Sequence, residues 1–461
     1  MQAIAQTASF QNSGSTRSLD GLFSPDGIPD HLPGEPLRPP LSLPSFVLRA
    51  ALRVPLLILL ATVTSWLWPV YFLAVLVWGW PPNVPRVPQI LRYLRLTWTV
   101  KPPAPGLGLG GRIWTTLSIL RKILVIPVWG LAWLLDEMLY GNQLKATPVV
   151  APLIEISAAR SGSTQLARYL EDDPHLAAPS LLQSVFPYLW LWRLVPKTLG
   201  RFVTADQVRH KMETAMPPEF IQRHEGDPFR TDTFDGALYI AHLNTLCMFL
   251  GPEVAVDDFG FGRLAPHNRT LWEKDFIDLM DGIARKTLLQ AGPGPDGKPR
   301  RFFVKGHFLC AGDALERKYP DARFLTMIRE PAPRLQSGVN FMRANPIDGA
   351  MGAVPWAWLG QTLVETETLY CDIEQVWYTK QGPARRCVLR FSEYVKDLEG
   401  AMKKVYRECL DIETLPPHVP TSHPPRERTN YLLNRSLAQV GVNDAALNAR
   451  LAGYIAWCRG R

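Results

Sequence analysis

The sequence predicts an α/β fold in which a mainly parallel central sheet is flanked by helices and follows an N-terminal transmembrane helix. Two stretches, 152–170 and 323–337, each contain a β-prone apolar run, a short polar turn and the start of a helical pattern. Repeated strand–turn–helix units of this kind build parallel sheets. A third segment, 54–80, has no charged residue and exceeds the roughly 20 residues that cross a bilayer.

The region before the predicted sheet divides into three parts. Residues 1–45 are rich in Ser, Pro and Gly without periodicity, so we expect disorder there. The transmembrane anchor is expected within 46–80, kinked at Pro69 and too far from the N-terminus for a cleaved signal peptide. Residues 81–147 form a basic juxtamembrane region. Its apolar run at 123–135 is too short to span comfortably and is expected to be an interfacial or core helix.

The first polar turn has the composition of an anion-binding loop, and its residues are Arg160, Ser161, Gly162, Ser163, Thr164 and Gln165. Backbone N–H groups at a helix N-terminus form a cradle for an anion, and a glycine lets the backbone approach closely. An ordinary loop with a serine N-cap has a similar composition, so the loop alone leaves both interpretations open. It lacks the first glycine and the lysine of the nucleoside-triphosphate motif G-x-x-x-x-G-K-[ST], which disfavours a kinase or an ATPase.

The second unit places Arg329 at the end of the apolar run 324–328 and Ser337 eight positions later. An arginine at a strand end and a serine on the following helix can close on one phosphate. The alternative is an ion pair between Arg329 and Glu330, with Ser337 an ordinary surface residue. Together the two units indicate a nucleotide with phosphate-like groups at two separate positions.

In these segments the chain resembles the sulfotransferase superfamily, whose enzymes use 3′-phosphoadenosine-5′-phosphosulfate. A-R-S-G-S-T-Q at 159–165 is similar to the family's 5′-phosphosulfate loop, and R-F-F-V-K-G-H-F-L at 301–309 to the strand between the two phosphate sites. The segment 319–337 is similar to the 3′-phosphate element, and 389–410 to a later strand and helix. The resemblance covers roughly 148–460 and implies a P-loop-like sulfotransferase domain over 148–461.

Two departures from the family pattern bear on donor binding. Ala159 replaces the usual proline, and the glycine-rich C-terminal donor motif of soluble members is not visible. Arg426 and Arg428 either substitute for that motif or belong to a solvated loop.

The resemblance implies sulfuryl transfer by in-line displacement, for which the sequence offers several candidate catalytic residues. His307 is the first candidate for the base, because an imidazole titrates near neutrality. Lys305, two residues earlier on the same face of a strand, can stabilise negative charge on the leaving group. Glu225, with His224 beside it, is the competing candidate. Glu155 lies inside the first strand, where a carboxylate requires a partner.

Composition constrains the partners. The net charge of +8 suits both an anionic donor and an anionic membrane, and nothing indicates nucleic-acid binding. Six cysteines show no metal-binding or disulfide spacing, so we expect no metal. The acceptor is expected to carry a hydroxyl, as in a carbohydrate, a lipid or a glycolipid. The aromatic stretch 185–192 could line its site or belong to the core.

The cellular location is expected from the family resemblance alone. Membrane-bound relatives face the Golgi lumen behind one anchor, so the resemblance implies a single-pass Golgi protein with a lumenal catalytic domain. Basic residues balance on the two sides of 54–80 and do not fix the orientation. The sequence does not fix the oligomeric state. Two alternative functions remain: a P-loop-type phosphotransferase using ATP and Mg²⁺, and a non-catalytic membrane protein that retains a nucleotide-binding fold.

Overall fold

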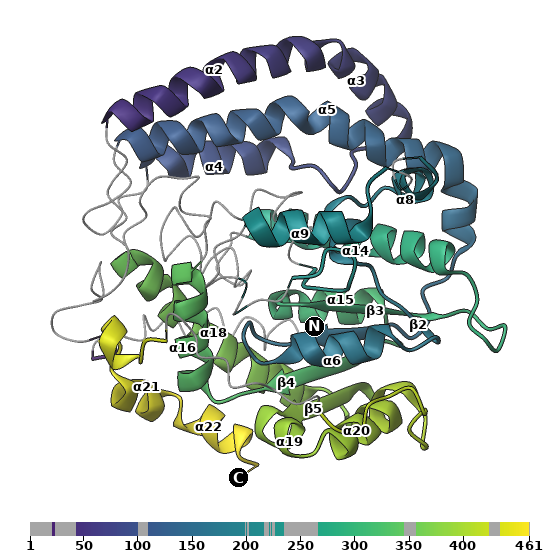
Figure 1. Ribbon diagram of the computed structural model, residues 1–461, viewed down its shortest axis with the longest axis vertical. Coiled ribbons are helices and arrows are strands. Elements are labelled where there is room, and N and C mark those ends of the chain that lie inside the picture. The colour runs from purple at the N-terminus through teal and green to yellow at the C-terminus, as the bar shows by residue number, and fades with distance from the viewer. Residues whose placement is uncertain are drawn as a thin grey trace.

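A five-stranded parallel sheet lies at the centre of the molecule (Figure 1). The computed structural model describes residues 21–23, 43–99, 109–198, 200, 202–215, 221, 223, 226–234, 266–344, 356–423 and 434–460. Its strands are β1 (Leu153–Ile156), β2 (Leu176–Ala177), β3 (Arg301–Gly306), β4 (Arg323–Ile328) and β5 (Arg386–Arg390). They are ordered β2-β3-β1-β4-β5, and all four pairings are parallel. The predicted α/β fold with a parallel central sheet is confirmed.

Helices follow the strands, as expected where parallel strands need crossover connections. Those between β1 and β3 are α6 (Ser163–Glu171), α7 (Leu181–Val185), α8 (Leu189–Leu194), α9 (Ala205–Ala215) and α14 (Pro266–Ala291). Those between β3 and β5 are α15 (Gly312–Lys318), α16 (Pro331–Ala344) and α18 (Trp356–Lys380). The described chain ends with α19 (Phe391–Lys396), α20 (Leu398–Leu410), α21 (Asp444–Arg450) and α22 (Ala452–Cys458).

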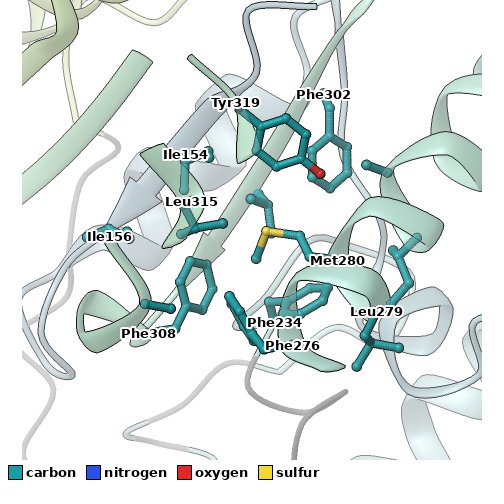
Figure 2. Packing of buried hydrophobic residues seen from close by; sticks show 14 of the residues in the cluster. Ile154, Ile156, Phe234, Phe276, Leu279, Met280, Phe302, Phe308, Leu315 and Tyr319 are labelled. Atoms are coloured by element: carbon teal, nitrogen blue, oxygen red, sulfur yellow. The ribbon is translucent and has the colours of Figure 1, made fainter. Parts of the chain in front are cut away.

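Alternate residues of the strands bury against opposite layers of helices. Ile154 and Ile156 pack with side chains of α14, among them Phe276 and Met280 (Figure 2). Leu153 instead belongs to the core formed with α6 and α20. Because successive side chains of a strand point to opposite faces, a strand covered on both faces must be apolar throughout, which explains the continuous apolar runs in the sequence.

Among the described residues, four helices precede the sheet, and they differ from the single anchor expected from the sequence. They are α2 (Leu43–Ser65), α3 (Leu67–Trp78), α4 (Val87–Thr99) and α5 (Leu109–Ala146). Within α5, Thr115–Ala146 is long and apolar enough to cross a membrane. Residues Ala51–Ser65 and Leu67–Trp78 pass the same test only as one pair, bent by 53°.

Pro69 explains the bend between α2 and α3. It has no N–H to donate to the carbonyl of Ser65, four residues earlier, and its ring crowds that carbonyl. The helix consequently breaks at Trp66, three residues before the proline where the kink was predicted.

The apolar run 123–135 packs in the core, as one of the two interpretations expected, but the prediction that its helix is short is wrong. The helix that contains it, α5, has 38 residues and continues beyond the charged residues Lys122 and Asp136. It can do so because Asp136 has a cationic partner, Lys286, which lies 3.0 Å away on α14. The expected disorder of 1–45 is also wrong for two short parts of that segment: Phe23 pairs with Val442, and residues 43–45 begin α2.

Candidate active site

The predicted functional segments meet at the carboxyl edge of the sheet, around the central strand β1. After β3 the chain crosses from one side of β1 to the other before it enters β4. In parallel α/β sheets, ligands bind outside the carboxyl ends of the strands where the strand order reverses in this way. The turns that follow β1, β3 and β4 carry Arg160, His307 and Arg329, respectively.

The turn after β1 has an unusual backbone. Arg160 and Gly162 have positive φ angles of 66° and 95°. Gly162 is the N-cap of α6, so the positive end of the helix dipole faces this turn. A Cβ at Gly162 would lie only 2.5 Å from Phe391, which explains on steric grounds why a glycine is present.

The polar side chains of this turn and of the start of α6 differ in how deeply they are buried. Ser161 is fully buried, and its Oγ donates to the carbonyl of Ala158 at 2.7 Å, so this serine holds the turn closed. Ser163 is also buried, whereas Thr164 and Gln165 are half-buried at the start of α6. The latter two are therefore the more accessible polar side chains of the predicted loop.

The two predicted phosphate segments are in direct contact. Arg160 Nε donates to Ser337 Oγ at 3.1 Å, and Arg329 Nη1 donates to the backbone oxygen of Arg160 at 2.9 Å. The guanidinium of Arg329 also lies over the ring of Phe391, 4.5 Å from its centroid. Phe391 thus packs against both the Gly162 turn and Arg329.

Glu330, the alternative partner expected for Arg329, forms an ion pair with Arg459 in the described part of the chain. Glu330 accepts two hydrogen bonds from Arg459, both at 2.9 Å, and these lower its carboxyl pKa below the usual range. Since Glu330 is bound elsewhere, its charge is already compensated. Ser337 is half-buried rather than an exposed surface residue.

Lys305 and His307 lie at the end of β3, beside residues that the sequence argument did not single out. Lys305 is buried and its Nζ is 3.7 Å from Asp232 Oδ1. His307 Nδ1 is 3.4 Å from Thr233 Oγ1. Neighbouring residues of one short segment, 231–234, therefore contact both predicted catalytic side chains.

Main-chain bonds and aromatic packing fix this segment against β3. The N–H of Phe234 donates to the carbonyl of Lys305 at 2.8 Å, and the hydroxyl of Tyr370 donates to the carbonyl of His307. Figure 2 shows Phe234 packed near Phe308, which follows the histidine, and the two ring centroids are 6.0 Å apart. The backbone on both sides of His307 is thus held by the core.

Glu155 has the partner that a buried strand carboxylate requires. It accepts a hydrogen bond from Ser157, whose oxygen in turn accepts from the N–H of Met327 at 2.8 Å. This chain of bonds joins the ends of β1 and β4. The register also pairs Glu155 with Lys305 on the neighbouring strand.

A buried ionic cluster supports the helix that carries Ser337. Arg334 donates to Glu367 at 2.7 Å, to Glu374 at 3.1 Å and to Tyr454 at 3.0 Å. Burial opposes the charge of Arg334, but Glu367 and its other partners hold the guanidinium pKa well above its usual value. Burial raises the pKa of Glu367 in turn. The cluster joins α16, α18 and α22, and it was not predicted from the sequence.

Several predicted elements lie elsewhere or outside the described residues. Glu225, His224, Arg426 and Arg428 fall outside the described part of the chain. The aromatic stretch 185–192 belongs to the core, as one of the two interpretations expected: Tyr188 stacks on Trp129 of α5 at 6.0 Å. Within the described ranges, no cluster of three or more metal-ligating side chains occurs.

Comparisons with known proteins agree on one family. The model of a sulfotransferase family matches residues 152–414. The sulfotransferase STF9 from Mycobacterium avium is 18% identical, with a TM-score of 0.55 over 84% of this chain and 95% of that one. The sulfotransferase STF1 from Mycobacterium tuberculosis H37Rv is 16% identical, with a TM-score of 0.50 over 84% of this chain and 98% of that one. No curated protein sequence matches the chain.

Proposed function

We propose, from the premise that this chain belongs to the sulfotransferase family, that it transfers a sulfuryl group from 3′-phosphoadenosine-5′-phosphosulfate to a hydroxyl acceptor. The observation that carries the proposal is the contact between Arg160 and Ser337, which joins the two predicted phosphate-binding segments at the carboxyl edge of the sheet. A donor with phosphate-like groups at both ends of its ribose requires two such segments at one site.

The donor would lie across the three turns after β1, β3 and β4. The turn at 160–165 would hold the 5′-phosphosulfate, with backbone N–H groups at the start of α6 and the side chains of Thr164 and Gln165. Arg329 and Ser337 would hold the 3′-phosphate by charge-assisted hydrogen bonds. Arg160, which contacts Ser337, lies between the two groups.

His307 would act as the general base. The acceptor hydroxyl oxygen attacks sulfur, its proton passes to the imidazole, and 3′-phosphoadenosine 5′-phosphate departs. Because Nδ1 lies against Thr233, the acceptor proton is expected at Nε2. Lys305, buried beside Asp232, would stabilise negative charge on the departing bridging oxygen.

The acceptor class and the compartment rest on the resemblance. We propose a carbohydrate, lipid or glycolipid hydroxyl as acceptor and the Golgi membrane, with a lumenal active site, as the location. Since 185–192 is part of the core, the acceptor is not expected to contact that aromatic stretch. The unplaced Glu225 remains the second proposed base.

A radiochemical assay tests the proposal. The detergent-purified chain is incubated with ³⁵S-labelled donor and separate pools of polar lipids, glycolipids and soluble glycans, with a metal chelator present. We expect labelled product in one pool, with equal turnover when Mg²⁺ is added. Label transfer from γ-³²P-ATP that requires Mg²⁺ would instead establish a phosphotransferase. Donor binding without transfer to any pool would favour a non-catalytic protein.

A further inference from the structure

The helix pair α2 and α3 presents an apolar outer face. Its large exposed side chains include Leu52, Leu59, Trp66, Leu73, Leu76 and Val77, and Leu76 is 82% exposed. Soluble monomers rarely expose contiguous apolar surface of this extent, so such a face marks an interaction site. Figure 1 shows the pair along one edge of the molecule, on the side of α5 that faces away from the sheet.

The inner face of the same pair is fixed to α5. Tyr71 on α3 is fully buried, and it packs so closely against Gly130 of α5 that no Cβ would fit there. Thr64, near the end of α2, is also buried. The pair therefore runs beside α5 along the body of the protein and does not project from it.

The opposite side of α5 is occupied by the α/β domain. Trp133 packs against Gly282 of α14, where a Cβ would lie 2.5 Å from the indole ring. Asp136 and Lys286 form an ion pair at 3.0 Å, and neither side chain is exposed. α5 and α14 therefore pack tightly against each other around Trp133 and Asp136.

This packing conflicts with a bilayer that crosses the molecule along α5 or α3. In such a bilayer, the part of α14 that packs against Trp133 would lie in the hydrocarbon region. The charged pair Asp281 and Arg285 belongs to this part of α14. Exposing ionised side chains to the hydrocarbon region is costly. The apolar surface and the domain lie on opposite flanks of α5, so a bilayer fits only along the outer flank.

The charge of this region complements an anionic membrane. Residues 36–135 contain ten arginines and lysines and no aspartate or glutamate. Arg95 on α4 and Arg121 on α5 are exposed. Basic side chains near a membrane surface are attracted to anionic headgroups.

We propose that the outer face of α2 and α3 lies in one leaflet of an anionic bilayer, with both helix axes near the membrane plane, so that the chain attaches without crossing. Trp66 and Trp78 then lie at the level where tryptophan is enriched in membrane proteins. The two helices are bent by 53° relative to each other at Trp66. This arrangement differs from the single span at 54–80 expected from the sequence, and it is independent of the proposed reaction.

Protease protection in sealed vesicles tests the topology. The full-length chain carries one tag at each end and a third inserted after residue 104, between α4 and α5. In-plane attachment predicts that all three tags are cleaved from the same side. End tags on opposite sides would establish a single span, and an inserted tag opposite both ends would establish a hairpin of two spans. Either result would overturn the proposal.

Vesicle flotation tests the face itself. We expect the purified chain to float with phosphatidylcholine vesicles that contain phosphatidylglycerol and to bind pure phosphatidylcholine more weakly. The variant Leu59→Lys/Leu73→Lys/Leu76→Lys should lose binding by about 100-fold or more, since three apolar side chains no longer enter the leaflet.

A matched control variant, Val203→Lys/Val376→Lys/Val395→Lys, changes three exposed apolar residues outside this face and should float like the wild type. Circular dichroism and thermal unfolding establish that both variants are folded. Unchanged flotation of the triple variant would contradict the proposal. A lipid-free wild-type dimer that the triple variant cannot form, without vesicle binding, would identify a second copy of the chain as the occupant instead.

Discussion

Arg160 Nε donates a hydrogen bond to Ser337 Oγ at 3.1 Å, although the two residues are 177 positions apart in the sequence. The contact joins the turn after β1 to the helix after β4. If Ser337 binds the 3′-phosphate, Ser337→Ala removes a charge-assisted hydrogen bond worth about 1.5–3 kcal/mol and weakens binding of 3′-phosphoadenosine 5′-phosphate about 10- to 150-fold. Calorimetric titration with this nucleotide and with AMP separates the roles. Equal weakening of both would show that Ser337 supports the turn instead.

Gly162→Ala is expected to destabilise the fold for two reasons. The residue has a φ of 95°, and the new Cβ would meet Phe391 at 2.5 Å. Gly297 provides a matched control, because its φ is 75° but nothing lies within 4 Å of the position of a Cβ. Gly297→Ala should cost only the backbone strain of about 1–2 kcal/mol. Gly162→Ala should cost about 1–3 kcal/mol more, from overpacking. Urea unfolding measures both, and equal losses would argue against the tight packing on Phe391.

His307→Ala should lower turnover by about 10²- to 10⁴-fold with little change in donor affinity, since it removes the proposed base. Thr233→Val should lower turnover less, because Thr233 orients the ring through Nδ1 and does not itself take the proton. Single-turnover sulfate transfer and nucleotide titration give the two readouts. Full turnover in His307→Ala, together with a large loss in Glu225→Gln, would assign the base to Glu225.

The pH dependence of stability tests the buried pair between α14 and α5. Burial lowers the pKa of Lys286 to about 8, whereas an unfolded lysine titrates near 10.4. Between these values the unfolded chain binds more protons, so the free energy of unfolding should rise with pH, by up to about 1.4 kcal/mol per unit. This gain in the free energy of unfolding is complete above the pKa of the unfolded lysine, and it is lost as the pH falls to about 8.

The double variant Asp136→Asn/Lys286→Met serves as the control for that measurement. It removes both charges and keeps one of the two side-chain oxygens at position 136, so one of the N–H groups of Leu189 and Trp190 retains its acceptor. Denaturant unfolding between pH 7.5 and about 10 should show the rise in the wild type and not in the variant. Identical curves would show that Lys286 keeps an ordinary pKa in the folded protein.

The fold could be predicted from the sequence because its signals are local. The runs 152–170 and 323–337 each contain a strand, a turn and a helix start within a few residues, and the structure has these elements in β1 with α6 and in β4 with α16. The spacing of Arg329 and Ser337 is likewise a local pattern. Such patterns depend only on neighbouring residues, so they can be recognised without information about the rest of the chain.

The site residues that cannot be predicted from the sequence depend on long-range contacts. Asp232 and Thr233 approach Lys305 and His307 only because the segment 231–234 runs beside β3, more than 70 residues away in the chain. The small polar run R-T-D-T before Phe234 was the one available signal. The length of α5 is not predicted for the same reason, because the buried Asp136 within this helix depends on a distant partner, Lys286.

A thermal-shift titration with 3′-phosphoadenosine 5′-phosphate, compared with ADP and Mg²⁺ and repeated on Arg329→Ala, tests the central claim most directly. At about 100 times its dissociation constant the nucleotide should stabilise the wild type by roughly 2.7 kcal/mol. In Arg329→Ala the affinity should fall about 10- to 150-fold, because charge-assisted bonds worth about 1.5–3 kcal/mol are lost. Stabilisation by ADP and Mg²⁺ alone, with none from the 3′-phosphorylated nucleotide, would contradict the account.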